Sequence, residues 1–409
     1  MRFLPLLLRK AIKVGGLTLY GPHGYRESFG SADQDPQVSI EITDPSLDWR
    51  IFLNPELKGA EAYMAGSLVV REGGAYEFLR LIFLNKRHFD LSASQVFWNK
   101  LNRKLRRFMQ HNPLARARRN VGHHYDLGND FYRLWLDEDL QYSCGYFPSG
   151  AETLAEAQRE KKRHVAAKLA LQSGQRVLDI GCGWGGLALY LARVADVEVT
   201  GVTLSKAQLA VARQRAAAAG LDSKVRFELC DYRSVTGRFD RVVSVGMLEH
   251  LETYFRTVRD RLAPGGVALI HSISTKAPPG ITGPFIRKHI FPGGYAPCIS
   301  EASLAIERSG LWMLDCEIWR LHYAKTLRLW RERFLDRRQE VVDLYDERFA
   351  RMWEFYLAAC ECAFAFGSST VVHYQLGRER DAVPLSRDYI DQQKQRLAKI
   401  EKSQPPRAS

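Results

Sequence analysis

The chain has 409 residues, of which 46% are hydrophobic and 26% are charged. This length predicts one catalytic-sized domain with a smaller companion, and this composition is typical of a soluble globular protein with a large core. The formal net charge of +13 indicates an anionic partner, and membrane phosphate headgroups and nucleic acid are the two candidates.

The sequence predicts neither a membrane-spanning or secreted protein nor a protein held together by disulfides or a metal ion. The apolar run Phe3–Leu8 is flanked by Arg2, Arg9 and Lys10, and it is too short for a transmembrane span or a secretory signal. The seven cysteines are scattered and form no C-x-x-C pair, so we expect neither a disulfide framework nor a metal site. A reducing cytoplasm fits this cysteine usage best.

The chain divides into four parts by composition. Residues 1–100 mix short β-like runs with turn clusters and are expected to form the companion domain, which would associate with lipid or membrane. Residues 101–122 form a strongly basic linker, which is either a solvated connection or a contact to anionic lipid. Residues 123–402 are expected to form the larger, catalytic-sized domain, and residues 403–409 a disorder-prone tail.

Apolar strands alternate with helices after Gly174. The pattern predicts strands over 176–180, 197–202, 225–229, 240–245 and 267–273, with helices between them and a turn over 263–266. Alternation of this kind predicts a parallel sheet covered on both faces, so the fold class is α/β and Rossmann-like. Ligands in such sheets lie beyond the carboxyl ends of the strands.

The stretch "VLDIGCGWGG" (177–186) carries a G-x-G-x-x-G turn directly after the first of these strands. A dinucleotide is one candidate ligand. However, Asp179 stands at the mouth of the turn, where its charge would repel a pyrophosphate and attract the ammonium of an amino acid. The next strand ends in Thr203-Leu204-Ser205 rather than in a ribose-binding acid, and a Pro-Gly-Gly turn before the last strand recurs in methyltransferases. S-adenosylmethionine is therefore the predicted cofactor, although a tight turn without a ligand would also explain the glycines.

Residues after the next two strands are further candidates for cofactor contact. Ser205 and Gln208 have the spacing of a capping box, and helix capping and ribose contact are compatible roles for them. Asp231 and Tyr232 lie where an adenine edge would be recognised, and a surface turn is the alternative.

Eight motifs together make the chain resemble the cyclopropane-fatty-acyl-phospholipid synthases and their mycolic-acid cyclopropane synthase relatives, in the same order along the chain. These motifs are "HYDLGNDFYRLWLD" (124–137), "YSCGYF" (142–147), "VLDIGCGWGG", "GVTLSKAQ" (201–208), "GMLEH" (246–250), "LIHSI" (269–273), "IFPGGY" (290–295) and "HYAKTLRLW" (322–330). The resemblance implies a class I S-adenosylmethionine-dependent methyltransferase sheet with a smaller N-terminal domain. It also implies transfer of a methylene group to the cis double bond of phospholipid acyl chains.

The resemblance assigns residues to two roles. A bicarbonate ion would be the base that removes a proton from the carbocation, in a cradle of Cys144, Glu249, His271, Ile273 and Tyr323. Such a cation requires a dry, apolar pocket. Cofactor contacts would come from Tyr142, Ser143, Asp179, Gly181, Gly183, Trp184, Thr203, Leu204, Gln208, Asp231 and Tyr232.

Structural roles remain as alternatives for several of these residues. Cys144 and Tyr323 are residue types that are common in cores, Glu249 is well placed to open a helix, and His271 lies in an apolar strand. The segment 276–295 is predicted to be a mobile loop over the acyl entrance with cations facing lipid phosphates, or else a solvated loop.

Relatives in the same family methylate without closing a ring, so a fatty-acyl C-methyltransferase is the alternative enzyme. A nucleic-acid methyltransferase is disfavoured, because no Asn/Asp-Pro-Pro-Tyr/Phe motif is present. A noncatalytic lipid-binding or cofactor-binding module would be expected to lack Glu249, His271 or Tyr323. We therefore expect a peripheral enzyme at the cytoplasmic face of an anionic phospholipid membrane, acting on unsaturated acyl chains and not on nucleic acid, and homodimerisation is possible.

Overall fold

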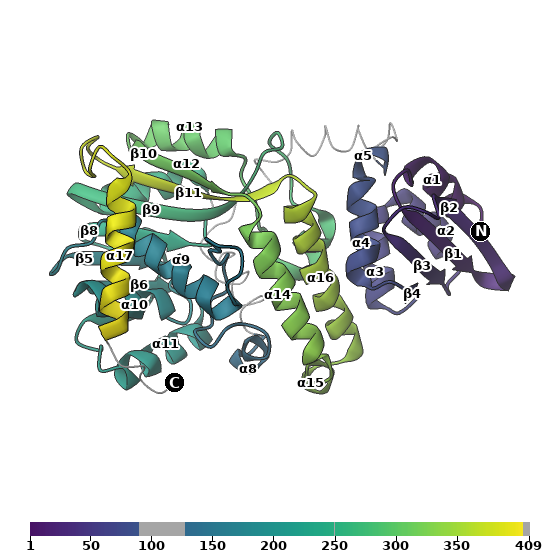
Figure 1. Ribbon diagram of the computed structural model, residues 1–409, viewed down its shortest axis with the longest axis horizontal. Helices are drawn as coiled ribbons and strands as arrows, with labels where there is room; N and C mark the ends of the chain where they lie inside the picture. The colour runs from purple at the N-terminus through teal and green to yellow at the C-terminus, as the bar shows by residue number, and fades with distance from the viewer. Residues whose placement is uncertain (90–126, 249, 404–409) are drawn as a thin grey trace. The chain divides into compact units, whose positions relative to one another are not determined.

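The computed structural model describes residues 1–89, 127–248 and 250–403 (Figure 1). The predicted basic linker 101–122, the candidate residue Glu249 and residues 404–409 of the predicted tail lie outside the described residues. The described chain forms two compact units. The first contains residues 1–89, 280–294 and 327–369, and the second contains the remainder.

The first unit is built on a four-stranded sheet in the order β2-β1-β3-β4, in which β1 pairs antiparallel with β2 and parallel with β3. Leucine and isoleucine side chains of the strands are buried against helices of the same unit, and α16 packs on α3 and α4. Its elements are α1 (Phe3–Ala11), β1 (Gly16–Gly21), η1 (Pro22–Gly24), β2 (Tyr25–Gly30), β3 (Gln37–Ile42), α2 (Leu47–Leu53), α3 (Pro55–Met64), β4 (Leu68–Glu72), α4 (Ala75–Leu84), α5 (Lys86–Phe89), η3 (Ile286–Ile290), α15 (Arg338–Leu344) and α16 (Glu347–Ala365).

The second unit is built on a seven-stranded sheet in the order β10-β11-β9-β8-β5-β6-β7. The strands from β9 to β7 in this order pair in parallel, whereas β10 is antiparallel to β11. Its strands are β5 (Arg176–Ile180), β6 (Glu198–Thr203), β7 (Val225–Leu229), β8 (Phe239–Val245), β9 (Leu262–Thr275), β10 (Trp312–Trp319) and β11 (Ser369–Gly377). Its helices are α8 (Asn129–Arg133), α9 (Leu154–Lys168), α10 (Gly186–Ala195), α11 (Lys206–Ala218), η2 (Tyr232–Ser234), α12 (Leu251–Arg261), α13 (Ile299–Ser309), α17 (Asp388–Ser403) and the first residues of α14 (His322–Asp336).

Helices cover both faces of this sheet (Figure 1). Successive strand residues enter opposite cores, because side chains alternate along a strand. Val177 packs in the core that α9, α10, α11 and α17 complete, and Leu178 packs in the core that α12 and α13 complete. The predicted α/β sheet with two covered faces is therefore confirmed.

The boundaries of the predicted strands agree with the structure to within a residue or two, except at β9. That strand begins at Leu262, five residues before the predicted start. Phe239 of β8 pairs with Leu262 and Arg241 pairs with Val267, so the residues predicted as a turn form an irregularity within the strand. Gly265 has a φ of +66° there, which explains why the sequence resembles a turn.

The division into units differs from the predicted domain boundaries at two places. Residues 280–294 and 327–369 group with the N-terminal sheet, although they fall inside the predicted catalytic domain. Within this unit the Lys288 ammonium lies 2.6 Å from a Glu61 carboxylate oxygen, and His289 Nε2 lies 3.4 Å from it. These two basic side chains of the segment predicted as a mobile loop are thus paired with an acid, and residues 286–290 form a helical turn.

None of the described helices combines the length and the apolar character that a membrane crossing requires.

Candidate functional site

The glycine turn after β5 has the backbone geometry that its sequence predicts. Gly181 and Gly183 have φ angles of +80° and +54°, in the left-handed region that other residues rarely adopt. Gly186 begins α10, and a Cβ atom there would lie 2.7 Å from a carboxylate oxygen of Asp139. The turn therefore brings bare backbone to the carboxyl end of β5.

Three amides of this turn are engaged within the protein. The N–H groups of Gly181 and Cys182 both donate to the carbonyl of Val202, at 2.9 and 3.1 Å, and the N–H of Gly185 donates to the carbonyl of Cys182. A pyrophosphate bound at such a turn uses free backbone N–H groups. This arrangement fits a ligand without phosphate better than a dinucleotide.

Asp179 lies on β5 with 2% of its surface exposed, and its Oδ2 atom has no hydrogen-bond partner among the described residues. Burial raises the pKa of its carboxyl to about 7, and the Lys161 ammonium opposes this effect. A buried carboxylate is costly without a donor or a cation. An ammonium or sulfonium ligand would supply the missing charge, so the site fits S-adenosylmethionine.

Lys161 is a central residue of the site that the sequence did not reveal. It lies on α9 with 1% exposure, and its ammonium donates to Gln141 Oε1 at 2.5 Å and to Ser143 Oγ at 2.7 Å. Burial lowers its pKa to about 8. In a helix rich in Lys and Arg, nothing local distinguishes a buried lysine from exposed ones, and only the contact with a loop 18 residues away identifies it.

The same loop presents the predicted cofactor contacts Tyr142 and Ser143. Gln158 of α9 donates to the carbonyl of Ser143 at 2.8 Å, so the helix holds both the backbone and the side chain of this residue. The Tyr142 ring lies 5.6 Å from that of Tyr132, which lies 5.1 Å from Trp184. These aromatic contacts join the half-buried Tyr142 to the buried Trp184, whose Nε1 donates to Asn129 Oδ1.

The end of β6 carries the predicted ribose contacts. Gln208 N donates to Ser205 Oγ, so Ser205 caps α11. In the predicted capping box the Gln208 side chain would accept from the Ser205 N–H. Instead, Ser205 N donates to Thr203 Oγ1, which in turn donates to Gln208 Oε1 at 3.1 Å. Leu204 is half-buried between these residues.

Asp231 and Tyr232 follow β7. Asp231 is 3% exposed and accepts two hydrogen bonds from the Arg233 guanidinium, both at 2.8 Å. The Tyr232 ring packs in the core with its centroid 5.4 Å from that of Tyr254. Their predicted role at the adenine remains a prediction.

Four of the five predicted cradle residues belong to the described chain. Cys144 is fully buried, and burial raises the pKa of its thiol far above the usual range, so it stays protonated. The N–H of Gly145 donates to Thr326 Oγ1 at 3.0 Å, which joins the Cys144 loop to the helix that carries Tyr323. His271 and Tyr323 are buried, and Ile273 is half-buried on β9. Glu249 lies outside the described residues.

Burial lowers the pKa of His271 to about 3, with a further contribution from Lys161. The imidazole is therefore neutral at physiological pH. Its Nδ1 lies 2.7 Å from Nε2 of His373 on β11, a residue that the sequence did not single out. Within an apolar strand a histidine gives no sign of its partner, which lies 102 positions away.

A second charged cluster lies near His373. One potential metal-ligand atom from each of His164, Glu317 and His373 lies within 4.8 Å of the other two. However, the Glu317 carboxylate already binds the Lys168 ammonium at 2.9 Å and His164 Nε2 at 2.8 Å. A metal ion would have to displace this ammonium, so the cluster is better described as a hydrogen-bonded ion pair.

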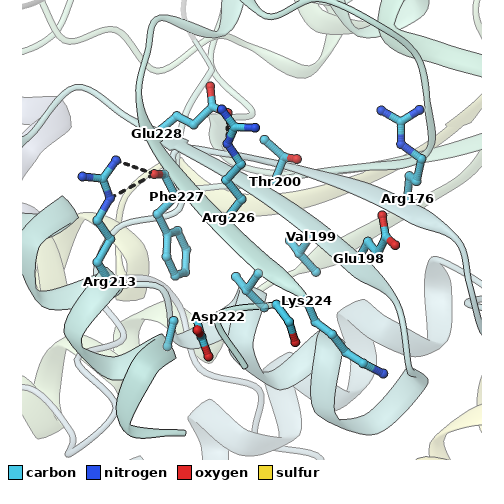
Figure 2. Close-up of a pocket in the computed structure, with 13 residues that line it drawn as sticks. Arg176, Glu198, Val199, Thr200, Arg213, Asp222, Lys224, Arg226, Phe227 and Glu228 are labelled. Atoms are coloured by element: carbon cyan, nitrogen blue, oxygen red, sulfur yellow. Dashed lines mark hydrogen bonds and ion pairs between the residues drawn. The ribbon is translucent and has the colours of Figure 1, made fainter. Parts of the chain in front are cut away.

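A hollow of about 620 Å³ lies along the edge strand β7 and the first residues of β5 and β6 (Figure 2). Figure 2 shows the Arg213 guanidinium donating to the carbonyl of Phe227, where it covers an edge-strand acceptor. The charged side chains around it are exposed or half-buried: Arg176, Glu198, Arg213, Asp222, Lys224, Arg226 and Glu228. None of the predicted site residues within the described part of the chain lines this hollow.

Comparison with known proteins gives consistent results. Residues 112–374 match the family model of mycolic acid cyclopropane synthetase. A probable fatty acid methyltransferase of Pseudomonas putida is 38% identical over 81% of this chain and 85% of its own length. The cyclopropane-fatty-acyl-phospholipid synthase of Escherichia coli K12 is 45% identical over 59% of this chain and 63% of its own length. A solved mycolic acid cyclopropane synthase complexed with S-adenosylhomocysteine and CTAB is 32% identical, with a TM-score of 0.60, over 63% of this chain and 97% of that one.

Proposed function

Because the chain belongs to the mycolic acid cyclopropane synthetase family, we propose that it transfers a methylene group to the cis double bond of phospholipid acyl chains, with bound bicarbonate as the base. The chain is an S-adenosylmethionine-dependent methyltransferase of the cyclopropane and fatty-acid type. The proposal adds the phospholipid substrate, ring closure and the anion.

The buried Asp179 carboxylate is the observation that supports the cofactor on which this reaction depends. It lies beside a turn whose amides are engaged, and Lys161 is the nearby cation that perturbs it. A cationic, phosphate-free ligand is the species that this environment stabilises. When bound, S-adenosylmethionine supplies an electrophilic methyl group to the alkene.

Residues of the chain would then protect the acyl cation and hold the anion that removes its proton. Cys144 and His271 are almost completely buried, so water has little access to them. The neutral His271 ring and the Tyr323 hydroxyl are donors suited to a small anion, and Cys144 stays a thiol that does not compete as a nucleophile. These properties support bicarbonate as the occupant of the cradle.

The lipid partner is supported by a patch on the first unit, which we call the α1–α2 patch. Trp49 and Leu53 of α2 are 50% and 66% exposed, and the ring of Phe52 lies 5.8 Å from that of Phe3 on α1. Large apolar side chains beside cations are typical of surfaces that lie in the lipid interface. The patch consists of Phe3, Leu6, Trp49, Phe52 and Leu53, with the cations Arg2, Lys10 and Arg50 on the same two helices or at their ends.

The two helices of the patch are fixed to one another. The Asp48 carboxylate accepts hydrogen bonds from the backbone N–H groups of Arg2 at 2.7 Å and Leu4 at 2.9 Å, so a residue of α2 caps the N-terminus of α1. Burial opposes ionisation, but these donors outweigh it and lower the pKa of Asp48. The patch is therefore preorganised at neutral pH.

Vesicle binding tests the lipid partner. We expect the double variant Trp49→Ser, Leu53→Ser to bind phosphatidylglycerol-containing vesicles at least fivefold more weakly than wild type, because two interfacial anchors are lost. Trp312→Ser is the matched control, since Trp312 is 52% exposed on the other unit. Equal sedimentation of the double variant and the control would contradict this surface.

Lipid mass spectrometry tests the reaction itself. Purified protein, S-adenosylmethionine and vesicles with monounsaturated acyl chains should yield acyl chains heavier by one methylene unit that no longer react as alkenes. Omission of bicarbonate in degassed buffer should reduce the yield. Unchanged acyl chains in the complete mixture would refute the proposal.

The alternative is methylation without ring closure. The Pseudomonas putida relative supports this alternative, because it is named a probable fatty acid methyltransferase and the similarity covers most of both chains. Proton loss without ring closure gives a product with the same mass gain that still carries a carbon–carbon double bond, so reactivity as an alkene and proton NMR for cyclopropane methylene signals distinguish the two reactions.

A further inference from the structure

The contact between the buried imidazoles of His271 and His373 restricts which ring nitrogen of each histidine carries its proton. The residues occupy the neighbouring strands β9 and β11, and His271 Nδ1 lies 2.7 Å from His373 Nε2. Both side chains are 2% exposed or less. A contact of this length between two ring nitrogens requires one N–H donor and one bare acceptor.

Both rings are neutral at physiological pH. Burial lowers the pKa of His271 to about 3, and burial with the neighbouring His271, Lys168, His164 and Lys161 lowers that of His373 well below its usual value. Each ring therefore carries one proton, and two arrangements remain. Either His373 donates from Nε2, or His271 donates from Nδ1.

The other nitrogen of His373 decides between these arrangements. His373 Nδ1 is buried and has no hydrogen-bond partner among the described residues. If His271 were the donor, the proton of His373 would sit on Nδ1 as a buried, unpaired N–H, which is rare and unfavourable in folded proteins. With the proton on Nε2, Nδ1 is only an unused acceptor. Donation from His373 is thus the favoured arrangement.

The surroundings hold the His373 ring in this orientation. The Trp319 ring lies 4.0 Å from the His373 ring and 5.3 Å from the His271 ring, centroid to centroid. His373 is paired with Glu317 across β10 and β11, and the Glu317 carboxylate is engaged by Lys168 and His164. The Glu317 carboxylate, which has an oxygen within 4.8 Å of a His373 ring nitrogen, therefore already has strong donors of its own.

We infer that His373 is a positioning residue that donates Nε2–H to Nδ1 of His271 and thereby fixes the remaining proton of His271 on Nε2, making His271 a hydrogen-bond donor to a small anion. This inference rests on the proposed function, because the anion is the bicarbonate proposed there. It deepens that proposal by assigning His373 the role of fixing the tautomer in which His271 donates from Nε2, which excludes His271 as the base. Fixing a ring tautomer through its second nitrogen is how buried histidines are oriented in other sites.

Nitrogen NMR of the full chain, labelled with 15N-histidine, tests the proton position directly. We expect His271, assigned by comparison with His271→Gln, to show a protonated Nε2 and a bare Nδ1 in wild type. The reverse pattern would overturn the inference. This measurement needs no turnover, so the two hypotheses can fail separately. Absence of any methylated acyl product would refute the proposed function, whereas the proton position of His271 is decided by the NMR spectrum alone.

Two variants extend the test to bicarbonate. His373→Phe removes the donor, and we expect a mixture of His271 tautomers and a half-saturating sodium bicarbonate concentration about tenfold higher, the equivalent of one lost hydrogen bond. His373→Gln keeps an N–H donor and should stay within threefold of wild type. The KM for S-adenosylmethionine should change less than twofold in both. An unchanged His271 spectrum in His373→Phe would contradict the positioning role, and if that variant does not fold, the wild-type spectrum decides.

Discussion

The carboxyl end of the seven-stranded sheet and the hollow along its edge strand β7 differ in whether their ionisable side chains are buried or exposed. The hollow has a volume of about 620 Å³ and many ionic side chains, but these are in contact with water or paired at the surface, as Lys224 is with Asp196. At the carboxyl end, Asp179, Lys161 and His271 are almost completely buried, and their pKa values are shifted strongly. Desolvated charge, rather than volume, marks the chemical site.

The largest expected effect separates the two regions by ligand binding. Asp179→Asn should weaken S-adenosylmethionine binding on the order of a hundredfold, because a buried carboxylate is lost from a cationic ligand. Asp222→Asn, at the hollow, should bind like wild type. Isothermal titration calorimetry of both variants measures the difference, and similar affinities would remove the basis for distinguishing the regions.

The next largest effect is expected on stability and turnover when the buried Lys161 is replaced, compared with the exposed Lys224. Lys161→Met removes the donor to Gln141 and Ser143, so we expect unfolding free energy to fall by about 2 kcal/mol and turnover by about thirtyfold. Lys224→Met breaks only an exposed, solvent-screened ion pair with Asp196, so its unfolding free energy should stay close to that of wild type. Urea unfolding and the acyl methylation assay test the pair, and equal losses of stability would show that burial of Lys161 has no special role.

The pH dependence of binding should reflect Asp179. Its pKa of about 7 means that the free protein must lose a proton before it holds a cation, so affinity should fall about tenfold between pH 8 and pH 6. Because this pKa is raised by folding, the unfolded chain binds fewer protons between pH 4 and pH 7, and the ligand-free protein should lose stability as pH rises through that window. Calorimetry across this range tests the sign, and Asp179→Asn should flatten the profile.

The smallest effect is expected at the hollow itself. Arg213→Gln removes two hydrogen bonds to the Phe227 carbonyl on an exposed strand edge, so unfolding free energy should change by about 1 kcal/mol or less, with no change in turnover. A loss of activity in this variant would give the hollow a function.

The sequence predicted the sheet because apolar periodicity and glycine turns are local signals. The strand 176–180 and the positive φ angles of Gly181 and Gly183 follow from neighbours within a few residues. Lys161 and His373 could not be found in this way, since each acquires its role from a partner far along the chain. The same reason explains the grouping of 327–369 with the N-terminal sheet, because α16 packs on α3 and α4 through long-range contacts.

The resemblance to a family identified residues that periodicity did not. Cys144 and Tyr323 are ordinary core residues by type, and the structure places them on a loop and a helix joined by the bond from Gly145 to Thr326. Their contact with a bound anion remains a prediction.

A crystal structure of the full chain with S-adenosylhomocysteine would locate the cofactor site. We expect ligand density at the glycine turn after β5, with the amino group of the ligand at Asp179 Oδ2 and no ligand in the hollow along β7. Density in that hollow, or a ligand whose amino group lies away from Asp179, would contradict this expectation.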